Sequence, residues 1–237
     1  MVRANGIFSP PRRKGVTLRY RGSSERARVS ARFDAIGVDT PKATGARLVR
    51  NIAMKPLKKN ATYDDLREVP EHFVAEMFDG ELYAIPRPGL PHARATTVLG
   101  AKLGDLFDWG SSGPGGWVIL YEPELHLGND VLVPDIAGWR RERLPAVPAD
   151  PHLALAPDWV CEVLSPSTEA LDRGKKLARY ARAGVAHAWL LNPVGRSLEV
   201  LALENGKWAL LDRHEGRSSI RARPFDEVEL ELRALWI

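Results

Sequence analysis

Two carboxylates lie in apolar segments of the sequence, where acidic side chains are uncommon. Asp135 falls within the run 133–136, and Glu162 lies in the middle of the run 159–164. A buried carboxylate is costly unless it is paired, hydrogen-bonded or bound to a metal. On neighbouring strands, two such groups could hold one hard cation through oxygen ligands, as Mg²⁺ requires. Alternatively, each could cap a strand end or pair with an arginine. The separation by 26 intervening residues does not distinguish these roles from a shared metal site.

A lysine follows Glu162 at helical spacing from two other polar residues. Asp172, Lys176 and Tyr180 are each four residues apart, so they share one face of a predicted helix. That helix begins seven residues after Glu162, and its first turns are expected to return over the same end of the sheet. Lys176 could then hold or polarise a hydrolytic water beside a metal. Spacing alone favours the simpler alternative, an Asp–Lys pair on a solvated helix face.

Turn and cap signals delimit the elements that must position these residues. Thr62 and Asp65 predict a helix start, and Asp79-Gly80 is typical of a tight hairpin turn. We expect helices at 62–66, 92–109 and 169–183, strands at 73–77, 81–85, 117–121, 124–127, 131–139, 159–164 and 186–191, and hairpins beyond. This order predicts a mixed α/β domain whose central sheet is flanked by helices.

Length and composition fit one folded domain. The 237 residues are 44% hydrophobic and 27% charged, enough for a core of ordinary size. No apolar run approaches the roughly 20 residues that span a bilayer, so we expect no membrane association. Cys161 is the single cysteine, which excludes an internal disulfide and a multi-cysteine zinc site. The cytoplasm is therefore the expected compartment.

Charge divides the chain into two parts. Residues 1–60 carry 15 Lys and Arg against 3 Asp and Glu, and residues 61–237 carry 19 against 27. The first part has high charge and low hydrophobicity, so we predict a disordered basic extension at 1–60 and one domain at 61–237. The extension could be a phosphate-binding arm, a targeting peptide, or an idle or artefactual tail with Met54 as the true start. We prefer the last of these, because a charge run alone is a weak signal.

Several segments from residue 61 onward resemble the Uma-two family of putative restriction endonucleases. The most specific block runs from Glu162 to Tyr180 and includes the run 172–180. Other matching residues are Glu76, His92 and Asp135, together with the segments 76–82, 133–135, 184–185 and 189–193. The other histidines share no spacing that forms a metal site, and we predict structural or exposed roles for them: His72, His126, His152, His187 and His214.

The resemblance implies a restriction-endonuclease-like fold of the PD-(D/E)XK superfamily and Mg²⁺-dependent hydrolysis of DNA, with Mn²⁺ as a substitute. Asp135 and Glu162 would be the metal ligands. The superfamily lysine expected two residues after the glutamate is Leu164 here, and Lys176 on the following helix matches the family's lysine. Glu76 would be a further metal or water ligand, and His92 would orient the substrate or the ligands.

The resemblance also implies a bacterial protein that acts on DNA as a homodimer. We expect Tyr180 and Arg173 to contact the substrate. The net charge of −8 over residues 61–237 opposes DNA binding, unless local basic patches overcome it: Arg140, Arg141 and Arg143, or Arg173, Lys175 and Arg179. Two functions are therefore consistent with the sequence. The first is a metal-dependent endonuclease, and the alternative is a catalytically inactive nuclease-fold module that binds nucleic acid or a protein partner.

Overall fold

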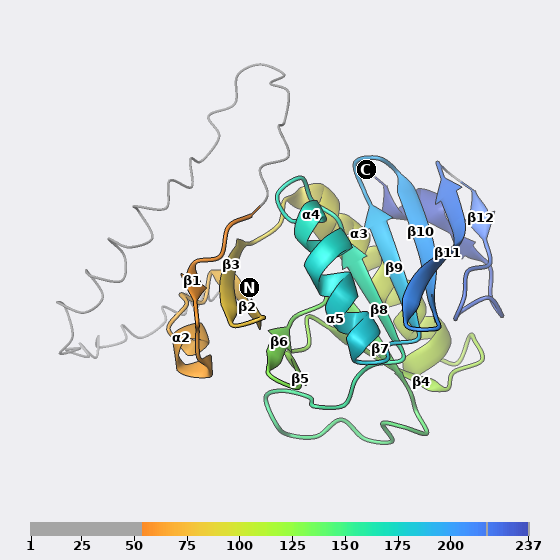
Figure 1. Cartoon of the computed structure of the whole chain (residues 1–237). Coiled ribbons are helices and arrows are strands. Elements are labelled where there is room, and N and C mark those ends of the chain that lie inside the picture. The colour runs from red at the N-terminus through yellow and green to blue at the C-terminus, as the bar shows by residue number, and fades with distance from the viewer. Residues whose placement is uncertain (1–53, 217, 237) are drawn as a thin grey trace, which may run out of the picture. The chain divides into compact units, whose positions relative to one another are not determined.

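The structure, a computed structural model, describes residues 54–216 and 218–236 (Figure 1). Most of the predicted basic extension, residues 1–53, lies outside the described residues. Its last residues are part of the fold, because strand β1 (Lys58–Lys59) pairs with strand β3 (Glu81–Pro86). The ordered domain therefore includes residues that composition alone assigned to the extension.

The central element is a mixed six-stranded sheet in the order β11-β10-β9-β8-β7-β4. Strands β8 and β9 are parallel, and every other neighbouring pair is antiparallel. Its strands are β4 (Trp117–Tyr121), β7 (Ile136–Arg140), β8 (Trp159–Val163), β9 (His187–Asn192), β10 (Ser197–Glu204) and β11 (Lys207–Glu215). The predicted mixed α/β fold is confirmed.

Helices cover both faces of this sheet (Figure 1). Helix α3 (Leu90–Leu103) continues into the π-helical turn η1 (Gly104–Asp108), and its apolar side packs into a tryptophan-rich core on one face. The other face carries α4 (Glu169–Leu171), the π-helical turn η2 (Asp172–Lys176) and α5 (Leu177–Arg182). Two separate cores result, one on each side of the sheet.

A smaller antiparallel sheet in the order β1-β3-β2-β6-β5 lies beside the first. Its remaining strands are β2 (Phe73–Phe78), β5 (Leu125–Leu127) and β6 (Asp130–Leu132). Asp79 and Gly80 take positive φ angles of 55° and 68° in the turn between β2 and β3, as predicted. Thr62 and Asp65 form the expected capping box of helix α2 (Tyr63–Arg67).

The C-terminal segment completes the core that contains helix α3. It forms a short sheet and a 3₁₀ helix: β12 (Ser219–Ile220), β13 (Leu230–Glu231) and η3 (Leu232–Leu235). Among the described residues, no helix combines the length and the apolar character needed to cross a membrane.

One predicted strand, residues 131–139, is wrong as a single element. It is divided into β6 and β7, which belong to different sheets. Pro134 stands at the division and has no N–H to donate to a sheet ladder, so the chain can leave one sheet there and enter the other. The division has a functional consequence, because Asp135 lies in it.

Candidate active site

Asp135 is held at the end of β8 by main-chain contacts. Its Oδ2 accepts a hydrogen bond of 2.7 Å from the N–H of Val163, and its own carbonyl accepts one of 3.1 Å from Glu122. The side chain is 16% exposed, so the carboxylate reaches solvent while its backbone stays fixed. Asp135 is thus adjacent to the strand that carries Glu162.

Strand alternation decides the direction of Glu162. Successive side chains of a strand point to opposite faces, and Trp159, Cys161 and Val163 pack in the core with helix α3. Val160 packs in the other core, which contains α5. Glu162 therefore points toward the helix that carries Lys176, and it is only 2% exposed.

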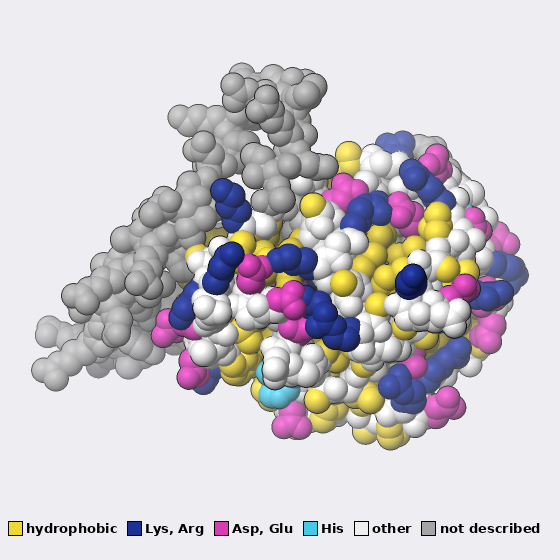
Figure 2. Space-filling view, in the orientation of Figure 1, with side chains coloured by type: hydrophobic (Ala, Val, Ile, Leu, Met, Phe, Trp, Pro, Cys, Tyr) yellow, Lys and Arg dark blue, Asp and Glu magenta, His cyan; other side chains and the backbone are white. Residues whose placement is uncertain are grey.

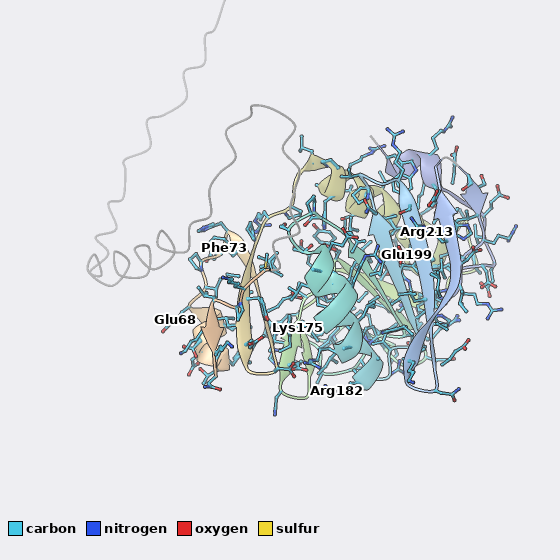
Figure 3. All side chains as sticks on the ribbon, turned by 45° about the horizontal axis from the view of Figure 1, so that its top comes forward. Glu68, Phe73, Lys175, Arg182, Glu199 and Arg213 are labelled. Carbon is cyan, nitrogen blue, oxygen red and sulfur yellow. The ribbon has the colours of Figure 1, made fainter. Side chains whose placement is uncertain are left out.

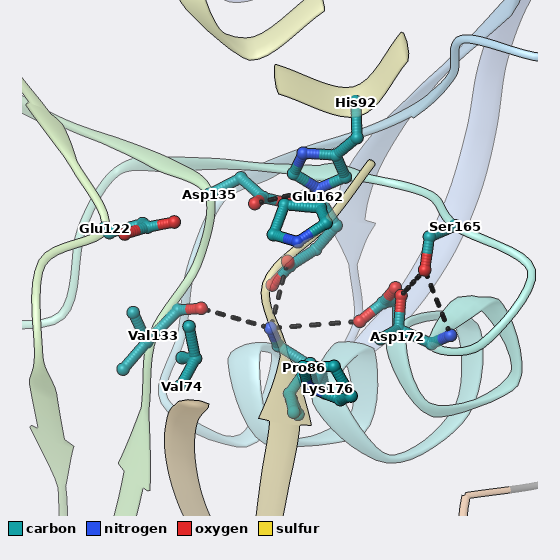
Figure 4. A pocket seen from close by; sticks show the side chains of 13 residues that line it. Val74, Pro86, His92, Glu122, Val133, Asp135, Glu162, Ser165, Asp172 and Lys176 are labelled. Carbon is teal, nitrogen blue, oxygen red and sulfur yellow. Dashed lines mark hydrogen bonds and ion pairs between the residues drawn. The ribbon is translucent and has the colours of Figure 1, made fainter. Parts of the chain in front are cut away.

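Lys176 is the centre of the buried polar cluster. Its Nζ lies 3.0 Å from Glu162 Oε2 and 3.2 Å from the Val133 carbonyl (Figure 4). It also lies 3.0 Å from Glu76 Oε1. Asp172, one turn earlier, lies 3.8 Å away. Lys176 and Asp172 are each 3% exposed, so the alternative of a solvated helix face is wrong.

Tyr180 is buried behind this cluster. It is fully inaccessible to solvent, and its hydroxyl donates a 2.5 Å hydrogen bond to Glu162 Oε1. The structure therefore gives Tyr180 no surface with which to contact a substrate, contrary to our expectation. It positions Glu162, whose two oxygens each accept from one helical side chain.

Glu76 and His92 approach the same cluster from β2 and α3. Glu76 Oε1 accepts a 2.7 Å hydrogen bond from the Val133 N–H, and its Oε2 is buried without a hydrogen-bond partner. His92 Nε2 lies 3.1 Å from Asp135 Oδ1, and its Nδ1 lies 3.3 Å from Thr96 Oγ1. The structure therefore brings together five of the predicted residues: Asp135, Glu162, Lys176, Glu76 and His92.

The cluster contains more acidic than basic groups. Burial raises the pKa of Glu162 well above its usual range, against the opposing effect of Lys176. Burial likewise raises the pKa of Asp172 to about 7. Burial would lower the pKa of Lys176, but the surrounding carboxylates outweigh it and raise that pKa well above its usual value. Lys176 therefore keeps its proton at neutral pH, and it lies among three carboxyl groups, those of Glu76, Glu162 and Asp172.

A pH dependence of stability follows for the metal-free protein. The pKa of Asp172 is about 7 in the folded state and about 3.9 when unfolded, so between these values the folded state binds more protons. The free energy of unfolding should therefore decrease as pH rises from about 4 to about 7. We expect Asp172→Asn to make this decrease smaller, as measured by denaturant unfolding in EDTA across that range. An unchanged pH slope in the variant would contradict the prediction.

A cavity of about 50 Å³ opens over the cluster (Figure 4). One water needs at least about 10–15 Å³, so the space fits a few waters, a cation or phosphate oxygens. The cavity is lined by polar or charged side chains and by a few apolar ones: His92, Glu122, Asp135, Glu162, Ser165, Thr168, Asp172 and Lys176, with Val74, Ile85, Pro86, Pro88 and Val133.

The donor set at this cavity fits a hard cation. Asp135 and Glu162 offer carboxylate oxygens, each with lone pairs left after the contacts described above. Glu76 Oε2 is a buried oxygen without a hydrogen-bond partner in the described structure. Mg²⁺ is usually bound by one or two carboxylates with water or phosphate as its other ligands.

The basic patches predicted from sequence are largely neutralised by acidic partners. Arg173 contacts Glu199 through two hydrogen bonds of 2.8 and 2.9 Å and also pairs with Glu169. Its guanidinium is therefore engaged by these two carboxylates, contrary to our expectation that Arg173 contacts the substrate. The other paired residues are Arg141, Arg143, Lys175 and Arg179. Arg140 instead lies over the Trp117 ring, at 4.2 Å from its centroid. Figure 2 shows acidic and basic side chains interspersed on one face, and Figure 3 shows Lys175 between its helix and the β2–β3 hairpin.

One group of metal-type ligands was missed by the sequence analysis. Glu124, His126 and His152 have side-chain ligand atoms within 4.8 Å of one another, although we predicted no shared role for these histidines. Glu124 and His126 are two apart, which places them on one side of a strand. His152 joins them only through tertiary structure, so no spacing rule could have found it.

Comparisons with known proteins identify a family and a structure with a similar fold. Residues 61–233 match the family model Uma2, described as a putative restriction endonuclease. The crystal structure of a putative nuclease belonging to DUF820 from Anabaena variabilis is similar, with a TM-score of 0.60 and 20% identity, over 74% of this chain and 97% of that chain. At this identity the likeness shows a shared fold. No curated protein matches the chain.

Proposed function

Since this chain belongs to the Uma2 family, described as putative restriction endonucleases, we propose that it is a metal-dependent endonuclease that hydrolyses DNA phosphodiester bonds. One observation carries the proposal. Two carboxylates and a buried lysine line a single cavity, although they come from three separate segments of the chain. A cavity that admits phosphate oxygens fits hydrolysis of the backbone of a nucleic acid.

In this proposal Asp135 and Glu162 hold Mg²⁺ or Mn²⁺. Such an ion supplies Lewis-acid stabilisation of the phosphate and lowers the pKa of water when it is bound. The protein supplies the orientation: Val163 N–H fixes Asp135, and Tyr180 fixes Glu162. His92 borders Asp135 on the cavity side, at 3.1 Å.

Lys176 acts in this proposal as a fixed positive charge. Its raised pKa means that it holds its proton, so it does not serve as a general base at neutral pH. An ammonium held in place by Glu76, Glu162 and the Val133 carbonyl costs no reorganisation when charge develops on the phosphate. Glu76 therefore positions Lys176.

The test is cleavage of supercoiled plasmid by the full chain with Mg²⁺, Mn²⁺ or EDTA. The proposal expects nicked and linear products with either metal and none with EDTA. Products that persist in EDTA would contradict a metal-dependent enzyme. DNA binding without cleavage, across varied substrates and metals, would instead support the alternative of an inactive nuclease-fold module.

Arg87 is a candidate for contact with the DNA backbone at the cavity mouth. It is exposed between Pro86 and Pro88, which line the cavity, and it donates to the Glu71 carbonyl at 3.4 Å. Within residues 54–216 and 218–236, no carboxylate forms an ion pair with it. Its charge is thus available to a phosphate.

Arg87→Ala should weaken DNA binding similarly for all sequences. Loss of one phosphate contact should also reduce the slope of log affinity against log salt by about 1. Fluorescence anisotropy in an Asp135→Asn background would measure binding without cleavage. Arg213→Ala is the matched control, because that exposed arginine on β11 is paired with Glu215 (Figure 3). Equal salt slopes for the two variants would refute the assignment.

A further inference from the structure

The long connection between β7 and β8 is fastened to strand β5 at one point. Leu125 and Leu153 form an isolated parallel bridge, with hydrogen bonds of 2.8 Å from His126 N–H to the Leu153 carbonyl and 2.9 Å from Leu153 N–H to the Glu124 carbonyl. Both leucines are buried in one core. Their neighbours Glu124, His126 and His152 are only partly buried, and they meet on the other side of this bridge.

The three side chains are close enough to share one ion. Their ligand atoms all lie within 4.8 Å of one another. His126 Nε2 is 2.7 Å from Glu124 Oε1, and the rings of His126 and His152 stack at 3.8 Å with an interplanar angle of 15°. A metal ion lies in the plane of each imidazole that ligates it, so one of the two rings would turn out of this stack when both bind one ion.

Two further observations indicate that this group can bind a ligand. His152 Nδ1 is buried without a hydrogen-bond partner in the described structure, and such groups are uncommon in folded proteins. Tyr63 donates a 2.8 Å hydrogen bond to Glu124 Oε1, and its ring meets the edge of His126 at 5.0 Å. Tyr63 thus orients two members of the group, as an outer-shell residue does at a metal site.

We propose that Glu124, His126 and His152 form a binding site for a divalent transition-metal ion of the Zn²⁺ class, which fastens the β7–β8 connection to β5. Two imidazoles and one carboxylate are a donor set that zinc accepts, with a fourth position for water. Mg²⁺ prefers oxygen ligands, so it would compete poorly here. None of the three residues lines the cavity at Asp135 and Lys176, so this site does not depend on the proposed nuclease activity.

The test is titration of the full chain, free of any affinity tag and of metal, with Co²⁺ and Zn²⁺ in excess Mg²⁺. We expect one equivalent of Co²⁺ with a visible absorption spectrum, displaced by Zn²⁺. His152→Ala and His126→Ala should weaken binding more than the roughly 10–100-fold that loss of an outer-shell partner costs, and Tyr63→Phe should fall within that range. His72→Ala is the matched control, since His72 is exposed and outside the group.

A structural readout separates a metal site from histidines that merely stabilise the fold. Zn²⁺ should protect the β7–β8 connection of the wild type from trypsin, and it should give no protection in His152→Ala. Asp135→Asn should bind Zn²⁺ as the wild type does. The proposal is overturned if the wild type binds no more tightly than His126→Ala and His152→Ala, or if Asp135→Asn abolishes binding, which would place the ion in the cavity.

Discussion

Asp135→Asn should reduce metal-dependent plasmid cleavage by about 10³-fold while the protein remains folded. Asparagine keeps the shape of the side chain, and its oxygen can still accept from the Val163 N–H. The substitution removes a charged ligand that the proposed ion requires. Metal-ion catalysis contributes several kcal/mol, and each 1.36 kcal/mol corresponds to tenfold in rate. The initial rate of nicking at saturating Mg²⁺ is the measurement.

Two comparisons make this result specific. Thermal unfolding in EDTA should give similar midpoints for the variant and the wild type, because Asp135 is partly exposed and asparagine can still accept from the Val163 N–H. Asp212→Asn is the matched control, since Asp212 is 58% exposed and lies on β11. A variant at Asp135 that cleaves within about threefold of the control would exclude Asp135 as a required ligand.

Lys176→Met should lower the free energy of unfolding more than any other single substitution proposed above, and it should also abolish cleavage. The ammonium is 3.0 Å from both Glu76 and Glu162, and all three side chains are almost fully buried. Breaking a buried pair by removing one partner costs about 3–5 kcal/mol, because the remaining charge is uncompensated. Chemical unfolding in EDTA would measure this cost, and the plasmid assay would measure activity.

A second variant separates the structural role of Lys176 from its proposed catalytic role. In Lys176→Met with Glu76→Gln, one uncompensated carboxylate is removed, so much of the lost stability should return. Cleavage should not return, because the double variant lacks the cation although it keeps both proposed metal ligands. A double variant that regained activity along with stability would show that Lys176 acts only in the fold.

The ion pairs of the basic side chains affect how strongly the protein can bind DNA. Phosphate contacts dominate nucleic-acid affinity, yet Arg173, Lys175 and Arg179 are committed to carboxylates of the chain itself. Arg87 contacts only a main-chain carbonyl among the described residues. We therefore expect modest DNA affinity that depends on Arg87 at the cavity mouth, and cleavage that is sensitive to salt.

Local features of the fold could be predicted from the sequence because their causes are local. The Asp79-Gly80 turn depends on residues that tolerate positive φ, and the helix start at Thr62 depends on one side chain and the N–H groups beside it. Alternation along β8 likewise predicts that the Glu162 side chain points to the opposite face of the sheet from Cys161 and Val163. The resemblance identified Asp135, Glu162 and Lys176, and the structure places them at one cavity.

Only the tertiary structure decided which side chains meet. Spacing favoured a solvated Lys176, but the crossing of its helix over β8 buries it between two carboxylates from different sheets. Tyr180 is 18 residues from its partner Glu162 in the sequence, and Arg173 is 26 residues from its partner Glu199. The packing of the helix on the sheet brings each pair together. His126 and His152 meet because a bridge joins residues far apart in the chain. Periodicity describes the direction of a side chain within its own element, whereas the partner of that side chain depends on which elements pack together.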